Sequence, residues 1–333
     1  MTTAFGILTP KAHQVIQRDG ADQADINITG YYSGDAPSSI EARWDGGAWV
    51  EIDAAPGNET FNGTLTNQAV GRGTLEVRYS NNHSKADSKE NVGIGDVFVI
   101  AGQSNASGRG TNNQSYSHAT LLASAYQNDY GCGDLVDPVD DSTNQVDMVS
   151  SDGGAAAGSC WPLVATEFLN DVEVPLGFIP CAKGGTNISD WEPGAEHEDR
   201  LTLYGSMVHR AKNVAGGVKA VLWQQGESDV IDGTTEAAYN TSLDTIADAI
   251  KTDLGVDLMA AKVQDIAGED ETAVNTAINT AWGDNANVLT GPDFSAFAPV
   301  GDLHFTTDAD LQKQAGTDAN VGWWDAMKAE WYT

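Results

Sequence analysis

The sequence predicts an α/β protein in which a small all-β sandwich precedes a three-layer, doubly wound parallel sheet. Residues 12–92 contain only short alternating runs separated by turn signals, whereas strands and helices alternate after residue 95. Helices between successive strands imply right-handed crossovers and a parallel sheet that is covered on both faces. We therefore expect two domains, at residues 1–94 and 95–333.

The first domain is expected from the alternation of apolar and polar residues. Such runs lie at 25–31, 48–52 and 74–79, and Gly- and Asn-rich turn signals lie at 45–47 and 62–63. No acid, base and nucleophile cluster in this region. Its role would therefore be packing, spacing or binding.

In the second domain, apolar β-branched runs alternate with segments of helical period. One helical window is especially clear, because Tyr239, Leu243 and Ile246 begin a single apolar stripe. Residues 112–160 fit neither pattern and are expected to form a long surface insertion beside the site. The expected strands cover 97–101, 175–179, 218–223, 257–263 and 286–290, and the expected helices cover 161–170, 200–215, 235–254, 270–282 and 308–331, the last broken near Gly316.

The charge balance restricts the partners. With 17 basic and 48 acidic residues the formal net charge is −31, which argues against nucleic acid and anionic membranes. Acidity spread along a lysine-poor chain is typical of a high-salt, halophilic setting. The sequence has no apolar run of about eighteen residues and no ordinary secretion signal, so membrane insertion is not expected and the location stays open.

The cysteines predict neither a disulfide framework nor a zinc site. Cys132, Cys160 and Cys181 are few and lack paired ligand spacing. Cys132 and Cys160 bracket a segment rich in Gly and Asp, and whether they pair or stay free thiols is open.

A polar tetrapeptide directly follows the strand at 97–101. Ligands bind outside the carboxyl ends of parallel strands, so Ser104 lies where chemistry could be placed. Taken alone, the stretch fits a nucleophile and a helix N-cap serine equally well. Other polar stretches follow later strands, at 181–191, 224–229 and 300–305. All of these turns should line one edge of the sheet.

A serine hydrolase also needs a base, and His304 is the natural candidate. It follows the last strand and has an acidic neighbour. The remaining histidines are expected to be solvated or core residues: His13, His83, His118, His197 and His209. No histidine cluster has metal-ligand spacing, so neither a metal nor another cofactor is expected.

Together the polar blocks resemble the serine esterases of the SGNH hydrolase superfamily. More narrowly, they resemble its sialate O-acetylesterase and acetylxylan esterase branch, carbohydrate esterase family 6. The likeness extends over roughly residues 95–331 and implies a flavodoxin-like SGNH domain. The matching blocks are GQSN at 102–105, GGTNISDW at 184–191, WQQGESD at 223–229 and DLHF at 302–305.

The resemblance implies a role for each block. Ser104 would be the nucleophile and His304 its base, and the Ser104 N–H would be one oxyanion donor. The Gly184-Gly185 turn would supply a second donor. The side-chain amide of Gln225 would supply a third, where other SGNH enzymes use asparagine.

One departure concerns the acid that orients the base. The superfamily usually spaces these residues as Asp-x-x-His, but position 301 is glycine and Asp302 precedes His304 by two residues. Asp302 could still reach the imidazole through a different turn. Otherwise the orienting group is Glu227, Asp229 or a backbone carbonyl.

The remaining site residues have alternative roles. Asn105, Glu227 and Asp229 are expected to support the site, the two acidic residues by tying loops together. Arg109 would either anchor a substrate carboxylate or pair with Glu227. Trp191 would be either a platform for a sugar face or part of the core.

The predicted function is a serine esterase that removes O-acetyl groups from an acetylated carbohydrate without a cofactor. A second hypothesis is a glycan-binding virion or cell-surface component on an esterase scaffold. Oligomer or virion partners would then bind through the β domain, and the location would be extracellular. A third is a lipase or thioesterase on the same superfamily fold.

Overall fold

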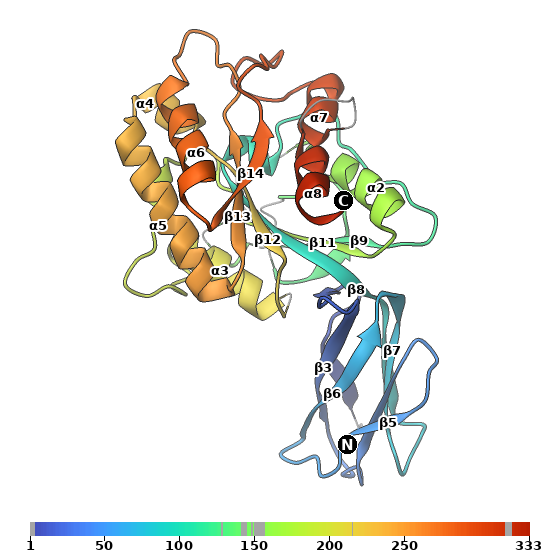
Figure 1. The fold of residues 1–333 in the computed structure, drawn as a ribbon. Helices are drawn as coiled ribbons and strands as arrows, with labels where there is room; N and C mark the ends of the chain where they lie inside the picture. Colours follow the sequence, from blue (N-terminus) through green and yellow to red (C-terminus); the bar gives the residue numbers. More distant parts are fainter. Residues whose placement is uncertain are drawn as a thin grey trace.

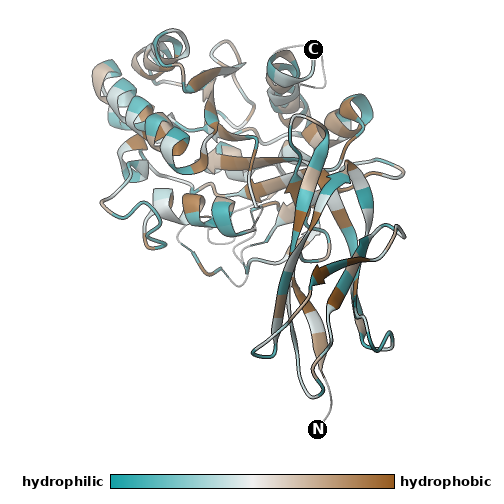
Figure 2. Cartoon of the chain, turned by 60° about the horizontal axis from the view of Figure 1, so that its bottom comes forward, coloured by the Kyte–Doolittle hydropathy of each residue, from teal (hydrophilic) through white to brown (hydrophobic). Residues whose placement is uncertain are grey.

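The computed structural model describes residues 4–127, 129–140, 145–147, 149, 157–214, 216–316 and 322–333. Its β-rich N-terminal region lies below a larger region in which helices surround a sheet (Figure 1). In the larger region the central strands are apolar, whereas the helices carry alternating apolar and polar residues (Figure 2). The described chain is thus a mixed α/β structure.

The N-terminal region contains two sheets that share one apolar core. In β3 every second residue is buried, which is the pattern of a strand with one face inward. Ile26 and Phe61 from one sheet meet Leu75 and Val92 from the other in this core. The first sheet contains β1 (Phe5–Thr9), β3 (Gln23–Tyr32) and β6 (Thr60–Ala69), and the second contains β2 (Val15–Gln17), β4 (Ile40–Trp44), β5 (Val50–Asp53), β7 (Gly71–Tyr79) and the first half of β8 (Ala86–Gly102).

Strand β8 belongs to both regions. It pairs antiparallel with β7 as far as Ile94, and then pairs parallel with β11 (Leu176–Pro180) from Asp96 onward. Every residue of its second half, from Val92 to Gly102, is buried. Burial on both faces explains the uninterrupted apolar run in the sequence.

The parallel sheet has β8 near its centre, between β11 and β12, and every strand predicted for this domain is present.

The expectation of a surface insertion at 112–160 is wrong for part of that segment. Residues 123–126 form a buried strand that pairs parallel with β11. Residues 141–144, 148 and 150–156 lie outside the described residues. The remaining strands are β9 (Ala123–Tyr126), β10 (Cys132–Asp134), β12 (Ala220–Gln224), β13 (Asp257–Lys262) and β14 (Val288–Asp293).

Helices cover both faces of this sheet (Figure 1). The predicted stripe of Tyr239, Leu243 and Ile246 is fully buried. The last helical segment breaks as predicted, because Gly316 ends the first of its two helices with a φ of 91°. One face carries α3 (Leu203–Val214), α5 (Glu236–Leu254) and α6 (Thr272–Asp284), and the other carries α2 (Trp161–Val172), α7 (Asp308–Ala315) and α8 (Trp323–Trp331).

The cysteine side chains answer a question that the sequence left open. Cys132, Cys160 and Cys181 are free thiols, so Cys132 and Cys160 do not pair. Among the helices that the structure describes, none has the length and apolar character needed to cross a membrane.

A buried carboxylate connects the two regions. Asp96 is fully buried and accepts hydrogen bonds from Arg18 Nε and Nη2, at 3.0 and 2.8 Å, and from Tyr332 Oη at 2.7 Å. Lys219 Nζ lies 3.6 Å away. Burial raises the pKa of the Asp96 carboxyl, but the hydrogen bond from Arg18 and the charges of Lys219 and Arg18 outweigh burial and hold it below its ordinary value.

Replacing Asp96 by asparagine should reduce the free energy of unfolding by about 3 kcal/mol, because Arg18 and Lys219 lose a buried counter-charge. Asp22→Asn is the matched control: Asp22 also binds Arg18, but its side chain is 67% exposed, so the cost should be below about 1 kcal/mol. Urea unfolding followed by tryptophan fluorescence measures both. Equal effects of the two substitutions would contradict a structural role for Asp96.

The difference in stability between wild type and Asp96→Asn should depend on pH. The lowered pKa of Asp96 gives stability that is complete above the ordinary aspartate pKa of about 3.9. It is lost as the pH falls through the lowered pKa of the folded state. The difference between wild type and Asp96→Asn should therefore shrink in acid.

Candidate active site

Ser104 begins the short helix α1 (Ser104–Ser107) immediately after β8. Gly102 makes this turn possible, because its φ is 120° and a Cβ there would lie 2.0 Å from the carbonyl oxygen of Gln224. As a first-turn residue, Ser104 has a backbone N–H with no acceptor inside its helix. The turn thus fixes the serine at the carboxyl end of the central strand.

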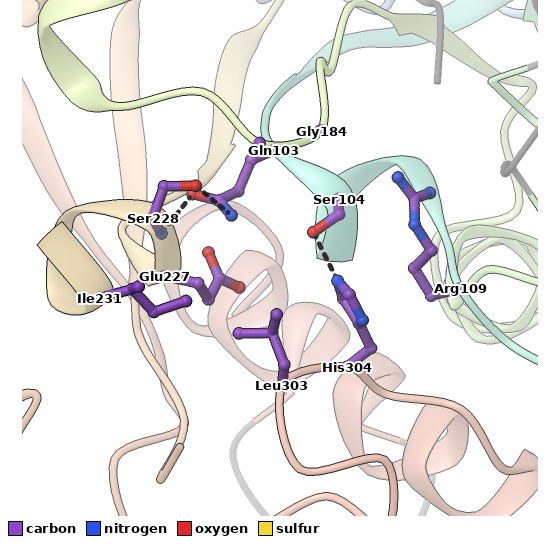
Figure 3. A pocket seen from close by; sticks show the side chains of 10 residues that line it. Gln103, Ser104, Arg109, Gly184, Glu227, Ser228, Ile231, Leu303 and His304 are labelled. Atoms are coloured by element: carbon purple, nitrogen blue, oxygen red, sulfur yellow. Dashed lines mark hydrogen bonds between the residues drawn. The ribbon is translucent and has the colours of Figure 1, made fainter. Parts of the chain in front are cut away.

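His304 approaches Ser104 from a loop that lies 200 residues later in the chain. Its Nε2 is 2.9 Å from Ser104 Oγ, within hydrogen-bond distance (Figure 3). A base at this distance can take the proton of an attacking hydroxyl. The structure therefore brings together the predicted nucleophile and base.

The pair lies in a pocket of about 310 Å³. The polar turns after β8, β11 and β12 and the loop before α7 meet there, as predicted from their positions after the strands. Leu303 and Ile231 add apolar surface to one side (Figure 3). The lining residues are Gln103, Ser104, Arg109, Gly184, Gly185, Glu227, Ser228, Ile231, Leu303 and His304.

The glycine turn at 184–185 lies at this pocket, as expected. Lys183 N donates to Gly102 O at 2.8 Å, which holds the turn against the end of β8. Gly185 has a φ of 72°, a conformation that favours glycine. Main-chain groups of this turn can therefore come close to a bound ligand.

Gln225 does not line the pocket, so the geometry does not support the expectation that it supplies an oxyanion donor. Its side chain is buried, and its Nε2 donates to Thr186 O at 2.9 Å and to Asp229 Oδ2 at 2.6 Å. Its Oε1 accepts from Tyr239 Oη at 2.9 Å. The amide is thus occupied in holding adjacent loops together.

Gln103 is the pocket amide that the sequence analysis missed. Its Oε1 accepts from Gly226 N, Ser228 N and Gln225 Nε2, each at 3.2 Å. These donors fix its carbonyl end, and its Nε2 makes one long contact of 3.4 Å, to Ser228 Oγ. The sequence feature that could have identified Gln103 as a pocket residue is its position directly before Ser104 in the turn.

Asp302 is not brought to His304. Asp302 is exposed, and its backbone has a φ of 58°. Among the contacts of the described residues, the Asp302 carboxylate makes no hydrogen bond to His304. The tight turn explains this, since Gly301 and His304 form a bridge across it and Asp302 N donates to Pro299 O. The expectation that Asp302 orients the imidazole is therefore not met by the geometry.

The two alternative carboxylates are engaged elsewhere. Asp229 accepts from Ile188 N at 2.9 Å and from Gln225, and Glu227 Oε1 accepts from Asn105 Nδ2 at 2.5 Å. Burial raises the pKa of both carboxyls. Both groups accept hydrogen bonds from other loops, and Glu227 also lines the pocket.

The two candidate substrate-binding residues have different positions. Arg109 lines the pocket on the side of His304 opposite Glu227 (Figure 3), and Glu227 Oε1 accepts a hydrogen bond from Asn105. Trp191 is fully buried, donates to Thr186 Oγ1 at 3.0 Å and packs edge-to-face on Trp223. Trp191 is therefore a core residue, and its role as a sugar platform is excluded.

Replacing Asp302 by asparagine should leave kcat within about threefold of wild type, rather than causing the roughly 10⁴-fold loss typical of removing an orienting carboxylate. Asparagine tolerates the positive φ at this position, so the turn is preserved. Steady-state hydrolysis of a chromogenic acetate ester measures the change. A loss of several orders of magnitude would return Asp302 to the catalytic group.

Comparisons with solved structures show similar folds. A carbohydrate acetylesterase from Xanthomonas citri has a TM-score of 0.52 at 17% identity, over 91% of this chain and 68% of the other. At that identity the likeness shows the fold alone. The crystal structure of an Arabidopsis thaliana protein has a TM-score of 0.51 at 26% identity, over 65% of this chain and 93% of the other.

Sequence comparisons give the family. A probable carbohydrate esterase of Arabidopsis thaliana is 30% identical over 179 residues, or 48% of this chain, and the match spans 64% of that relative's length. The family model described as "carbohydrate esterase, sialic acid-specific acetylesterase" matches residues 94–316, more than half of the chain. The chain therefore belongs to this family of carbohydrate esterases, which are hydrolases.

Proposed function

We propose that the protein is a serine esterase that removes O-acetyl groups from a carbohydrate. The observation that carries this proposal is the 2.9 Å contact between Ser104 Oγ and His304 Nε2 inside a pocket at the carboxyl edge of a parallel sheet. Helices on both faces of this sheet also support an SGNH-type three-layer domain, preceded by a β-sandwich.

In the proposed reaction His304 Nε2 takes the proton of Ser104 Oγ as this oxygen attacks the acetyl carbonyl carbon. The tetrahedral intermediate collapses, the bond to the sugar oxygen breaks, and His304 returns the proton to that oxygen. Water then attacks the acetyl–Ser104 ester with His304 again as base. Acetate leaves and the free serine is restored.

The negative charge of the intermediate needs donors. Ser104 N–H is one, because the helix leaves it without an acceptor, and the Gly184-Gly185 turn supplies a second. We assign the third to Gln103 Nε2 in place of Gln225, since Gln103 lines the pocket and Gln225 does not. The three donors that hold the Gln103 carbonyl keep its nitrogen end at the pocket.

The pocket also suits the two parts of the substrate. Leu303 and Ile231 supply apolar surface that a small acyl methyl can cover. Arg109 lines the same pocket, and its guanidinium would donate charge-assisted hydrogen bonds to a carboxylate on the sugar. An acetylated acidic sugar satisfies both features.

Replacing Ser104 by alanine should abolish acetate release from p-nitrophenyl acetate and from acetylated sialic acids or xylo-oligosaccharides, because no hydroxyl remains to form the acyl-enzyme. Acetate is quantified enzymatically. Ser107→Ala is the matched control: Ser107 lies on the same helix, but its Oγ contacts Gln103 O. Hydrolysis that persists in Ser104→Ala would refute the mechanism.

Replacing Gln103 by glutamate should lower kcat by roughly 10²-fold or more, because a carboxylate oxygen replaces the donor that faces the developing oxyanion. Glutamate retains an oxygen that can accept from Gly226 N and Ser228 N, so the melting temperature should change little. Steady-state kinetics and differential scanning fluorimetry separate the two effects. An unchanged kcat would show that Gln103 supplies no donor.

A further inference from the structure

We propose that Asn105 is a positioning residue that holds His304 against Ser104, and that Glu227 fixes the orientation of the Asn105 amide. This inference rests on the proposed serine esterase mechanism and deepens it. Asn105, the residue after Ser104, would keep the imidazole of His304 within hydrogen-bond distance of Ser104 Oγ.

The central observation is that one side chain binds the main chain on both sides of His304. Asn105 Nδ2 donates to Leu303 O at 3.1 Å, and Asn105 Oδ1 accepts from Phe305 N at 3.2 Å. Leu303 and Phe305 are the immediate neighbours of His304. Because Asn105 also follows Ser104 directly, a single residue links the nucleophile to the backbone of its base.

Glu227 adds a third contact that favours the same orientation of the Asn105 amide. Its Oε1 lies 2.5 Å from Asn105 Nδ2, and a carboxylate can only accept a hydrogen bond. A flipped amide would place its oxygen against the oxygens of Glu227 and Leu303, and its nitrogen against Phe305 N–H. All three contacts would then be lost, so Glu227 strengthens the preference that Leu303 O and Phe305 N–H set for the orientation that binds both sides of His304.

Further buried amides keep these groups in place. Gln314 Nε2 on α7 donates to the backbone oxygen of Asn105 at 2.9 Å, and Gln264 Nε2 donates to Leu303 O at 2.8 Å. Asn105, Glu227, Gln264 and Gln314 are each at most 2% exposed. Side chains so buried do not exchange their partners for water.

The loop that carries His304 needs such support. Within the turn, His304 N reaches Gly301 O only at 3.4 Å, and Asp302 has a positive φ. A displacement of about 1 Å between reacting groups can cost roughly 10²-fold in rate. Asn105 therefore supplies the precision that the local turn does not.

The test is the rate at which phenylmethylsulfonyl fluoride modifies Ser104, followed by intact-protein mass spectrometry. Ser104 Oγ bonds to sulfur, the S–F bond breaks, fluoride leaves, and His304 takes the serine proton. Asn105→Ala should slow this reaction about 10²-fold, and should lower kcat for acetate esters similarly with KM within about threefold. A labelling rate close to wild type in folded Asn105→Ala would overturn the proposal.

Two variants of Glu227 test independently whether Glu227 orients the Asn105 amide. They also decide the proposal if Asn105→Ala does not fold. Glu227→Gln keeps an oxygen that accepts from Asn105, so labelling should stay within about threefold of wild type. Glu227→Leu removes the acceptor and should slow labelling by about tenfold or more. Equal rates in the two variants would exclude an orienting role for Glu227.

Asn285→Ala is the matched amide control. Asn285 Nδ2 donates to Asp244 Oδ1 at 2.8 Å and its Oδ1 accepts from Asn287 N, beside the opposite end of β14. It should leave labelling within about twofold of wild type even if the melting temperature falls. Slowing as large as in Asn105→Ala would show that general destabilisation causes the effect, which would overturn the proposal.

Sulfonylation involves neither acetate nor sugar, so the result separates this inference from the proposed function. Wild type that is labelled at Ser104 but releases no acetate would refute the esterase proposal and leave the positioning role testable by labelling alone. Wild type that releases acetate, with an Asn105→Ala variant of equal activity, would refute only the positioning role.

Discussion

Strand β8 is the constraint on which the rest of the structure depends. It pairs with β7 in its first half and with β11 and β12 in its second, so one backbone sets the register of both regions. Its end at Gly102 lies so close to Gln224 O that any side chain would clash. A shift of the strand by one residue would bring Ala101 or Gln103, which both carry a Cβ, to this glycine position, and would exchange every side chain between the two packed faces. The position of Ser104 therefore follows from the packing of the whole sheet.

The site is built mainly from neutral amides rather than from ion pairs, although the chain carries a net charge of −31. Gln103, Asn105 and Gln225 each bind groups from a different loop, and the two buried carboxylates, Glu227 and Asp229, each accept from one of these amides. An amide offers a donor and an acceptor at once, so it can satisfy both an N–H and a C=O group without the desolvation cost of a buried charge. This chemistry lets four chain segments converge on a small pocket.

Much of this arrangement could be predicted from the sequence, because its signals are periodic or topological. The stripe on α5, the strand before Ser104 and the placement of His304 at the same sheet edge all follow from spacing. Other features depend on tertiary contacts that leave no local pattern. Whether Gln103 or Gln225 faces the pocket is decided by hydrogen bonds to distant loops. The buried strand β9 (Ala123–Tyr126) consists largely of small residues and gives no apolar run, and the outward turn at Asp302 results from a positive φ.

The net negative charge of the chain and the arginine in the pocket would act in opposite directions on an anionic substrate. On the proposed function, a net charge of −31 would repel an anionic sugar at long range, whereas a hydrogen bond from Arg109 would act only inside the pocket. The screening length is about 10 Å at 0.1 M salt and about 3 Å at 1 M, so salt weakens the distant repulsion more than a contact inside the pocket. An acidic substrate would thus gain access as the ionic strength rises, while a neutral one would be little affected. The acidic composition of the chain would then make substrate choice depend on salt.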